Sequence, residues 1–295
     1  MSESAPPWAL EESDAAPAQL VAAPALELIQ RAEIDTQIAT AKKYPRADLT
    51  QIRNRMLSFA TLDEETAESC FYTLRRKEAQ SGREKLIQGP SVRLAEIAVA
   101  CYGNLRAGAR IIENDGRKVT SQGVCFDVEN NVLISVEVDR RITGRDGRPY
   151  SEDMQITTAN AAKSISFRNA VFKVVPMALI KPVFEEVKKV ATGGAQTLAQ
   201  KRDKIFKRLD QMGVPQARVL DVLERGALQD VDLDDLTKLI GLGTAIKEGE
   251  ISVEDAFPGA PQEAPPAPQP KKKSFRDKIL EEGPPASATR PEEVV

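Results

Sequence analysis

Alternation of apolar and polar side chains is clearest between residues 131 and 142. Val132, Ile134, Val136 and Val138 occupy every second position there, and polar residues fill most of the positions between them. This period of two predicts a strand in a sheet that is buried on one face. Similar runs predict neighbouring strands, so that the four expected strands cover residues 104–113, 117–128, 131–142 and 149–157.

Two Asp-Gly pairs separate these predicted strands, at Asp115-Gly116 and at Asp146-Gly147. An Asp-Gly pair between alternating apolar residues is the strongest short-range signal for a β-hairpin, because tight hairpin turns need residues that tolerate a positive φ. We therefore expect the strands to pair antiparallel. Helical spacing of apolar residues follows at 158–175, and this long helix is expected to pack back on the sheet.

Helical spacing also appears on both sides of the sheet region. Gly89-Pro90-Ser91 opens one predicted helix, which Gly103 ends. The polar run from Arg75 to Gln88 is expected to form a mobile loop. The other predicted helices cover residues 26–43, 48–60, 62–72, 183–190, 197–212, 215–225 and 232–247.

Composition divides the chain into four parts. Residues 1–25 are rich in Ala, Pro and Glu and are expected to be a disordered acidic tail. Residues 26–192 form the predicted α+β core, in which an antiparallel sheet packs on a long helix. Residues 196–257 are expected to be a separate, small all-α domain. Residues 258–295 are a Pro-rich, disordered linker with a short amphipathic docking helix at 275–282.

Charge is distributed unevenly, although the formal net charge is only −3. Residues 1–40 carry one basic and seven acidic side chains, whereas residues 71–175 carry 17 Lys and Arg against 12 Asp and Glu. Residues 221–255 are again acidic, with three basic and ten acidic side chains. This acidic–basic–acidic order indicates a basic central surface that meets a polyanion.

Basic residues gather on the predicted strands, on the hairpin turns and on the long helix. On that helix Lys163 and Phe167 lie four residues apart, as do Arg168 and Phe172, so each basic residue has an aromatic neighbour. A basic groove with aromatic platforms is typical of proteins that bind single strands, although core packing would also explain the phenylalanines. The candidate DNA-binding residues are Arg106, Arg110, Arg117, Lys118, Arg140, Arg141, Arg145, Arg148, Lys163, Arg168 and Lys173.

Several reaction classes are disfavoured by what the sequence lacks. It has no histidine, so the usual general base near neutral pH and the commonest metal ligand are both missing. It has no GxxxxGK[ST] phosphate loop. Cys70, Cys101 and Cys125 form no CxxC pair and are expected to be reduced, buried thiols. We expect no catalytic residue, no metal, no cofactor and no membrane span.

One enzymatic alternative stays open. Asp127, Glu129, Glu137, Asp139 and Asp153 lie on neighbouring predicted strands, and a two-metal nuclease needs clustered carboxylates. An exposed polar strand face explains the same residues more simply. No lysine follows Glu137 at the spacing of the common restriction-type nuclease motif.

Residues 85–185 resemble the single-strand DNA annealing superfamily of bacteriophage recombination proteins, which includes Red beta, Erf and RecT. The resemblance rests on GPSVRLAEIAVACYGNLRAGARIIENDGRKVTSQGVCFDVENNVLISVEVDRRI and on TTANAAKSISFRNAVFKVVP. It implies a curved antiparallel sheet and a long helix whose basic residues line a DNA groove. Arg168 and Lys173 match the basic positions of that helix, Lys163 matches less closely, and Phe167 stands where a second basic residue is common.

The resemblance implies a homo-oligomer, a ring or a helical filament, that pairs complementary single strands without ATP. It also implies the cytoplasm of a phage-infected bacterium, and contact of residues 196–295 with a phage exonuclease or a host single-strand-binding protein. We therefore expect a DNA-binding and annealing protein of homologous recombination, and not an enzyme. A metal-dependent accessory nuclease and an oligomeric scaffold that does not bind DNA are the alternatives.

Overall fold

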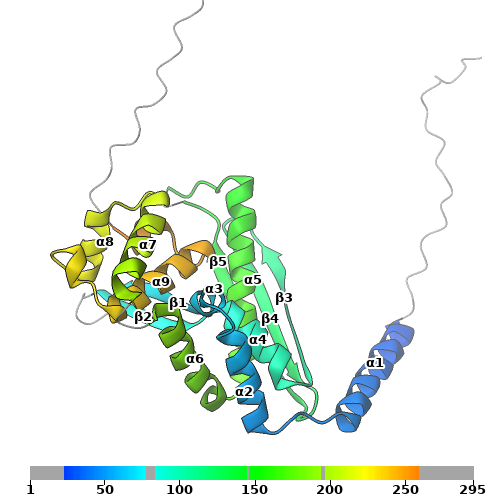
Figure 1. The fold of residues 1–295 in the computed structure, drawn as a ribbon. Helices are drawn as coiled ribbons and strands as arrows, with labels where there is room; N and C mark the ends of the chain where they lie inside the picture. The colour runs from blue at the N-terminus through cyan, green and yellow to red at the C-terminus, as the bar shows by residue number, and fades with distance from the viewer. Residues whose placement is uncertain (1–22, 78–83, 145, 194–196, 259–295) are drawn as a thin grey trace, which may run out of the picture. The chain divides into compact units, whose positions relative to one another are not determined.

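The computed structural model describes residues 23–77, 84–144, 146–193 and 197–258. It is an α+β fold, as the sequence predicts, and its antiparallel sheets have two and three strands (Figure 1). The strands are β1 (Phe71–Lys77), β2 (Glu84–Pro90), β3 (Leu105–Asn114), β4 (Lys118–Asp127) and β5 (Val132–Arg141). The helices are α1 (Ala23–Lys43), α2 (Leu49–Ala60), α3 (Glu64–Ser69), α4 (Val92–Tyr102), α5 (Glu152–Val174), α6 (Met177–Thr192), α7 (Leu198–Gln211), α8 (Gln216–Leu223), α9 (Leu233–Lys247) and α10 (Val253–Ala256).

The larger sheet is antiparallel, with β4 between β3 and β5. Gly123 of β4 lies opposite Ala109 of β3 and Val136 of β5, which fixes the register of all three strands. In the turn before β4, the Asp115 carboxylate accepts the backbone N–H groups of the next two basic residues, while Gly116 adopts a φ of 79°. The predicted alternation and the predicted Asp-Gly turn are both confirmed.

One face of this sheet is covered by α5 (Figure 1). The hydroxyl groups of Ser121 on β4 and Ser166 on α5 lie 2.9 Å apart and share a hydrogen bond. Gly123 allows the helix to come this close, because a Cβ at that position would lie only 2.1 Å from the carbonyl oxygen of Ser166. Small residues therefore set the distance between the helix and the sheet.

The strand predicted at 149–157 is wrong, because α5 occupies most of this range. Within the described residues, the β-pairing of this range is limited to an isolated bridge between Thr143 and Pro149. A serine cap precedes the helix, and Glu152 and Asp153 lie in its first turn, where carboxylates stabilise the helix dipole. These start signals outweigh the short alternation of apolar and polar residues.

The loop predicted from Arg75 to Gln88 is also wrong. β1 and β2 pair antiparallel over seven residues each, and residues 78–83 between them lie outside the described chain. Phe71 and Thr73 of β1 are buried, which anchors this hairpin. Charged residues in both strands interrupt the alternation of apolar and polar positions, so the sequence shows no clear strand signal there. Backbone pairing between β1 and β2 holds the hairpin together instead.

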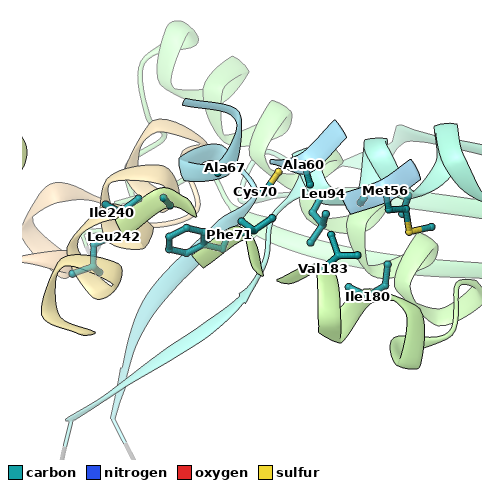
Figure 2. Packing of buried hydrophobic residues seen from close by; sticks show 14 of the residues in the cluster. Met56, Ala60, Ala67, Cys70, Phe71, Leu94, Ile180, Val183, Ile240 and Leu242 are labelled. Atoms are coloured by element: carbon teal, nitrogen blue, oxygen red, sulfur yellow. The ribbon is translucent and has the colours of Figure 1, made fainter. Parts of the chain in front are cut away.

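The helices after α6 share one hydrophobic core with the sheet region, so the separate domain predicted at 196–257 is wrong. Figure 2 shows Ile240 of α9 beside Phe71 of β1 within this core. Gly241 permits the contact, because a Cβ there would lie 2.2 Å from the Thr73 hydroxyl. The C-terminal helices therefore pack directly on the β1–β2 hairpin.

The three cysteines are buried free thiols, as predicted. Burial raises the pKa of Cys70 to about 12 and that of Cys125 to about 11, so neither thiol is a nucleophile near neutral pH. Among the described helices, none is both long and apolar enough to cross a membrane. Residues 1–22 and 259–295, which include most of both predicted tails and the predicted docking helix, lie outside the described residues.

Candidate nucleic-acid interface

The two faces of the β3–β4–β5 sheet differ in what covers them. The face that includes Ser121 and Gly123 packs against α5 and is termed the covered face. Successive residues of a strand point to opposite faces, so the alternate residues form the other side, termed the open face. The open-face residues are Arg106, Gly108, Arg110 and Glu113 of β3, Lys118, Thr120, Gln122, Val124 and Phe126 of β4, and Leu133, Ser135, Glu137, Asp139 and Arg141 of β5.

Three arginines of the open face are exposed, and none has a carboxylate within ion-pair distance among the residues that the structure describes: Arg106, Arg110 and Arg141. The Arg106 guanidinium donates a hydrogen bond of 3.0 Å to the carbonyl oxygen of Leu105. That of Arg110 lies 3.5 Å from the amide oxygen of Gln122. These contacts leave the positive charges without a counter-charge, so the guanidinium groups can bind an anion.

Apolar side chains lie at one end of the open face. Phe126 stands opposite Arg106 on β3 and opposite Leu133 on β5. Leu133 is 61% exposed, and Phe126 is half-buried between its neighbours. Aromatic and apolar groups beside basic residues are what single-strand binders offer to bases.

Lys118 lies at the opposite end of the open face and is paired. Its ammonium group lies 2.7 Å from the Asp139 carboxylate, which also accepts the hydroxyl of Thr120. The hydrogen bond from Lys118, with that from Thr120, lowers the pKa of Asp139, and the same bond to Asp139 raises the pKa of Lys118. Lys118 is therefore less free to bind a ligand than the three arginines.

Arg140 lies on the covered face, although its neighbour in the sequence lies on the open one. Its guanidinium donates hydrogen bonds to the carbonyl oxygens of Gly249 at 2.8 Å and of Glu250 at 3.1 Å. These bonds tie β5 to the segment between α9 and α10. The position corrects the prediction that Arg140 contacts DNA, because the side chain lies on the face that α5 covers and binds two carbonyl oxygens within the chain.

The side chain of Arg168 extends from α5 and is enclosed by β1 and the segment before α10. Its side chain is 7% exposed and forms an ion pair with Glu250, whose side chain is 2% exposed. The guanidinium also lies 4.3 Å from the centre of the Tyr72 ring. Because Glu250 balances its charge and Tyr72 covers it, Arg168 does not reach the surface, which corrects the prediction of a DNA contact.

The remaining predicted residues do not form one group. Arg117 is exposed in the turn between β3 and β4, and Lys173 is exposed near the end of α5. Arg148 is exposed before α5, and its guanidinium lies 3.6 Å from Asp146. Arg145 lies outside the described residues. Of the predicted residues, the structure therefore gathers Arg106, Arg110, Lys118 and Arg141 on the open face and Arg117 in the adjoining turn. The open face also carries the carboxylates Glu113, Glu137 and Asp139.

Lys163 lines a cavity of about 390 Å³ between α4, β3 and α5, together with Glu96, Asn160 and Phe167. A second cavity of about 710 Å³ adjoins it, since Val92 and Ser164 line both. The charged residues that line the larger cavity are Glu65, Glu68, Arg93, Arg208, Lys247 and Glu248.

The basic residues of the larger cavity are absent from the sequence prediction, because they meet only when α4, α7 and α9 pack together. Arg208 pairs with Glu68 at 3.0 Å, and Arg93 pairs with Glu96 at 2.8 Å. Burial, together with repulsion from a neighbouring carboxylate, raises the pKa of Glu248 to about 7. Acidic and basic groups balance here, so the cavity suits a polyanion less well than the open face does.

The strand carboxylates do not converge on one point. Asp127 lies on the covered side, where its carboxylate pairs with Arg46 at 2.6 Å, whereas Glu137 and Asp139 lie on the open face. Within the described ranges, the one group of three acidic side chains close enough to share a metal ion consists of Asp232, Asp234 and Asp235. Arginine and lysine side chains already pair with that group. No observation therefore favours the nuclease alternative.

Comparison of the chain with protein-family models, with curated proteins and with solved structures finds no match. The interface therefore has to be interpreted from its own geometry. That geometry separates an open face with exposed, unpaired arginines from a covered face whose basic groups bind partners within the chain.

Proposed function

We propose that this protein binds single-stranded DNA on the open face of the β3–β4–β5 sheet and anneals complementary strands without hydrolysing a nucleotide. The observation that carries the proposal is the group of exposed arginines that have no carboxylate partner in the described chain: Arg106, Arg110 and Arg141. Phosphate is a suitable partner, because it accepts paired hydrogen bonds from a guanidinium group. The resemblance of residues 85–185 to the annealing superfamily is the reason for naming DNA.

The open face supports annealing through electrostatics and stacking. Two complementary strands repel each other because both backbones are negatively charged, and arginines that bind phosphates reduce this repulsion and release counterions. Phe126 and Leu133 offer an apolar surface to a base, and one stacked base contributes about 1–3 kcal/mol. A sheet face that no described helix covers also leaves the other bases accessible to an incoming strand. None of these steps needs a titrating side chain.

A strand-annealing assay tests the proposal. Two complementary labelled oligonucleotides are mixed with the full chain, without nucleotide or magnesium, and duplex formation is followed against a protein-free control. We expect the wild-type protein to accelerate annealing, and the double variant Arg106→Ala/Arg141→Ala to lose most of that acceleration. Its single-strand affinity should show a log–log salt slope that is shallower by about 1.4, since each lost phosphate contact removes about 0.7.

The matched control is Arg53→Ala/Lys207→Ala, which removes two positive charges from exposed positions on α2 and α7. This variant should anneal almost as fast as the wild type. Equal losses in both double variants would show that only net charge matters and would remove the open face as the site. No acceleration by the wild type, with no retention of DNA at low salt, would favour the scaffold alternative.

A further inference from the structure

The larger cavity, of about 710 Å³, lies where α3, α4, α5, α7 and α9 meet. Pockets that bind small molecules in proteins have volumes of about 300–1,000 Å³, so this cavity is large enough for such a ligand. The apolar side chains of Val92 and Met212 line it beside the charged groups. Gly243 leaves open space in the wall, because a Cβ there would meet nothing within 4 Å. The cavity can therefore accept a small polar molecule that has an aliphatic part.

Some of the charges around this cavity are already paired within the chain. Arg208 pairs with Glu68 at 3.0 Å, and Arg93 pairs with Glu96 at 2.8 Å. Three charged residues that line the cavity form no ion pair with any other described residue: Glu65, Lys247 and Glu248. The unpaired groups are thus two carboxylates and one ammonium group. A complementary ligand carries two cationic groups and one anionic group.

Glu248 is the most enclosed of these three residues. Its Oε2 atom is buried and accepts no hydrogen bond from the described residues. The charged groups that act on it belong to two ion pairs, Arg168 with Glu250 and Arg93 with Glu96, so Glu248 has no counter-charge of its own. Burial, with repulsion from Glu250, raises the pKa of Glu248 to about 7, which agrees with a carboxyl group that lacks a cationic partner. A buried acceptor without a donor costs free energy, which a ligand that supplies the donor restores.

We propose that this cavity binds a free basic amino acid, with a guanidinium group at Glu248 and the α-ammonium and α-carboxylate groups at Glu65 and Lys247. A guanidinium group suits the inner position, because it is weakly hydrated and donates two parallel hydrogen bonds to a carboxylate. Glu65 and Lys247 are both exposed, which suits the two charged groups that share one carbon atom of the ligand and stay in contact with water. Val92 and Met212 offer apolar surface to the aliphatic stem. L-arginine is the amino acid that meets all these conditions.

Other small ligands complement the cavity less well. The phosphate of a nucleotide brings negative charge to a cavity in which unpaired carboxylates outnumber the unpaired ammonium group. A polyamine has no anionic group for Lys247. A neutral molecule leaves Glu248 without a counter-charge. The signs of the unpaired groups therefore select a basic amino acid.

This inference does not depend on DNA binding. None of the described residues that line the cavity belongs to β3, β4 or β5. The amino-acid site and the open face therefore use different side chains, and the two proposals fail separately.

Isothermal titration calorimetry of the full chain with L-arginine tests the site. We expect saturable binding of one molecule per chain. L-citrulline, which has a neutral ureido group in place of the guanidinium, should bind about tenfold more weakly or worse, the effect of losing a charge-assisted contact. Agmatine lacks the carboxylate, and N-acetyl-L-argininamide has both α groups blocked as they are in a peptide. Both should bind more weakly than arginine.

Two substitutions remove the site in different ways. Glu248→Gln keeps the shape of the side chain but removes its charge, and should weaken arginine binding by about tenfold or more. Gly243→Leu fills the open space and should abolish binding, while leucine favours the helix more than glycine does. Glu33→Gln, at an exposed position on α1, removes a carboxylate elsewhere and should bind arginine as the wild type does.

Each outcome decides for or against the site, with circular dichroism showing that every variant folds. The absence of saturable binding to the wild type, equal affinity for citrulline, or unchanged binding by Glu248→Gln would overturn the proposal. Equal affinity for N-acetyl-L-argininamide would also overturn it, because the ligand would then be an arginine within a protein chain. Arginine binding without strand annealing leaves this site standing and removes the proposed function, whereas annealing without arginine binding removes only this site.

Discussion

Arg140 and Arg141 are adjacent in the sequence but have opposite surroundings. Arg141 is exposed on the open face, whereas Arg140 lies on the covered face and donates to the carbonyl oxygens of Gly249 and Glu250. The period of two of a strand sends their side chains to opposite sides of the sheet. Of these two adjacent arginines, Arg141 is therefore a candidate for ligand contact, whereas Arg140 stabilises the fold.

The same contrast holds along α5. Lys163 lines an open cavity, but Arg168 is enclosed by Tyr72 and by its ion pair with Glu250. Arg140 on the covered face and Arg168 on α5 thus both bind the segment between α9 and α10. The arginines of the open face have no such partners within the described residues. Substitutions on the covered and open faces can test this difference.

The largest effect on stability is expected for Arg168 of α5. Replacing Arg168 with alanine should lower the free energy of unfolding by about 3–5 kcal/mol, because it leaves the Glu250 carboxylate buried without its partner. Urea denaturation followed by circular dichroism measures this change. Lys163→Ala, on the same helix, should change stability by less than about 0.5 kcal/mol. Equal stability of both variants would contradict a structural role for Arg168.

Alanine substitutions at two glycines allow the packing on the two faces to be compared directly. A Cβ at Gly123 would lie 2.1 Å from the carbonyl oxygen of Ser166, whereas a Cβ at Gly108 on the open face meets nothing within 4 Å. Gly123→Ala should therefore cost about 1–3 kcal/mol through overpacking. Gly108→Ala should be neutral or slightly stabilising in the same denaturation experiment. A costly Gly108→Ala would mean that another part of the protein packs on the open face.

Glu248 makes the free energy of unfolding depend on pH. Burial, with repulsion from Glu250, raises the pKa of Glu248 from 4.5 to about 7. The folded protein therefore holds this proton more tightly than the unfolded chain, so this group makes stability fall as the pH rises from 4.5 to about 7. The slope is at most about 1.4 kcal/mol per pH unit.

Glu248→Gln removes this contribution. Its stability relative to the wild type should increase as the pH rises through that range, in denaturation curves measured at a series of pH values. Parallel curves for wild type and Glu248→Gln would show that the carboxyl group is not perturbed.

Local signals in the sequence were enough for much of the fold. Alternation around Val136 and the turn at Asp115-Gly116 predicted the β3–β4–β5 sheet, because pairing and turn chemistry act over a few residues. The hairpin of β1 and β2 and the start of α5 were missed. In the first, charged residues hide the strands, and in the second, alternation competes with helix-start signals at Glu152 and Asp153.

The candidate site was predicted only in part. Arg106, Arg110 and Arg141 were named correctly as exposed basic residues of strands. The burial of Arg168 was not predictable, because its partner Glu250 lies 82 residues away and reaches it only through tertiary packing. Charge counting finds basic residues, but their partners decide which of them a ligand can reach.

The most direct test of the account measures single-strand affinity against salt for Arg141→Ala and for Arg140→Ala. Both variants lose one positive charge from adjacent positions, so they differ mainly in the face that loses it. The account predicts that Arg141→Ala makes the log–log slope shallower by about 0.7, the value of one phosphate contact, while Arg140→Ala keeps the wild-type slope. A shallower slope for Arg140→Ala, with no change for Arg141→Ala, would contradict the account and place the DNA on the other side of the sheet.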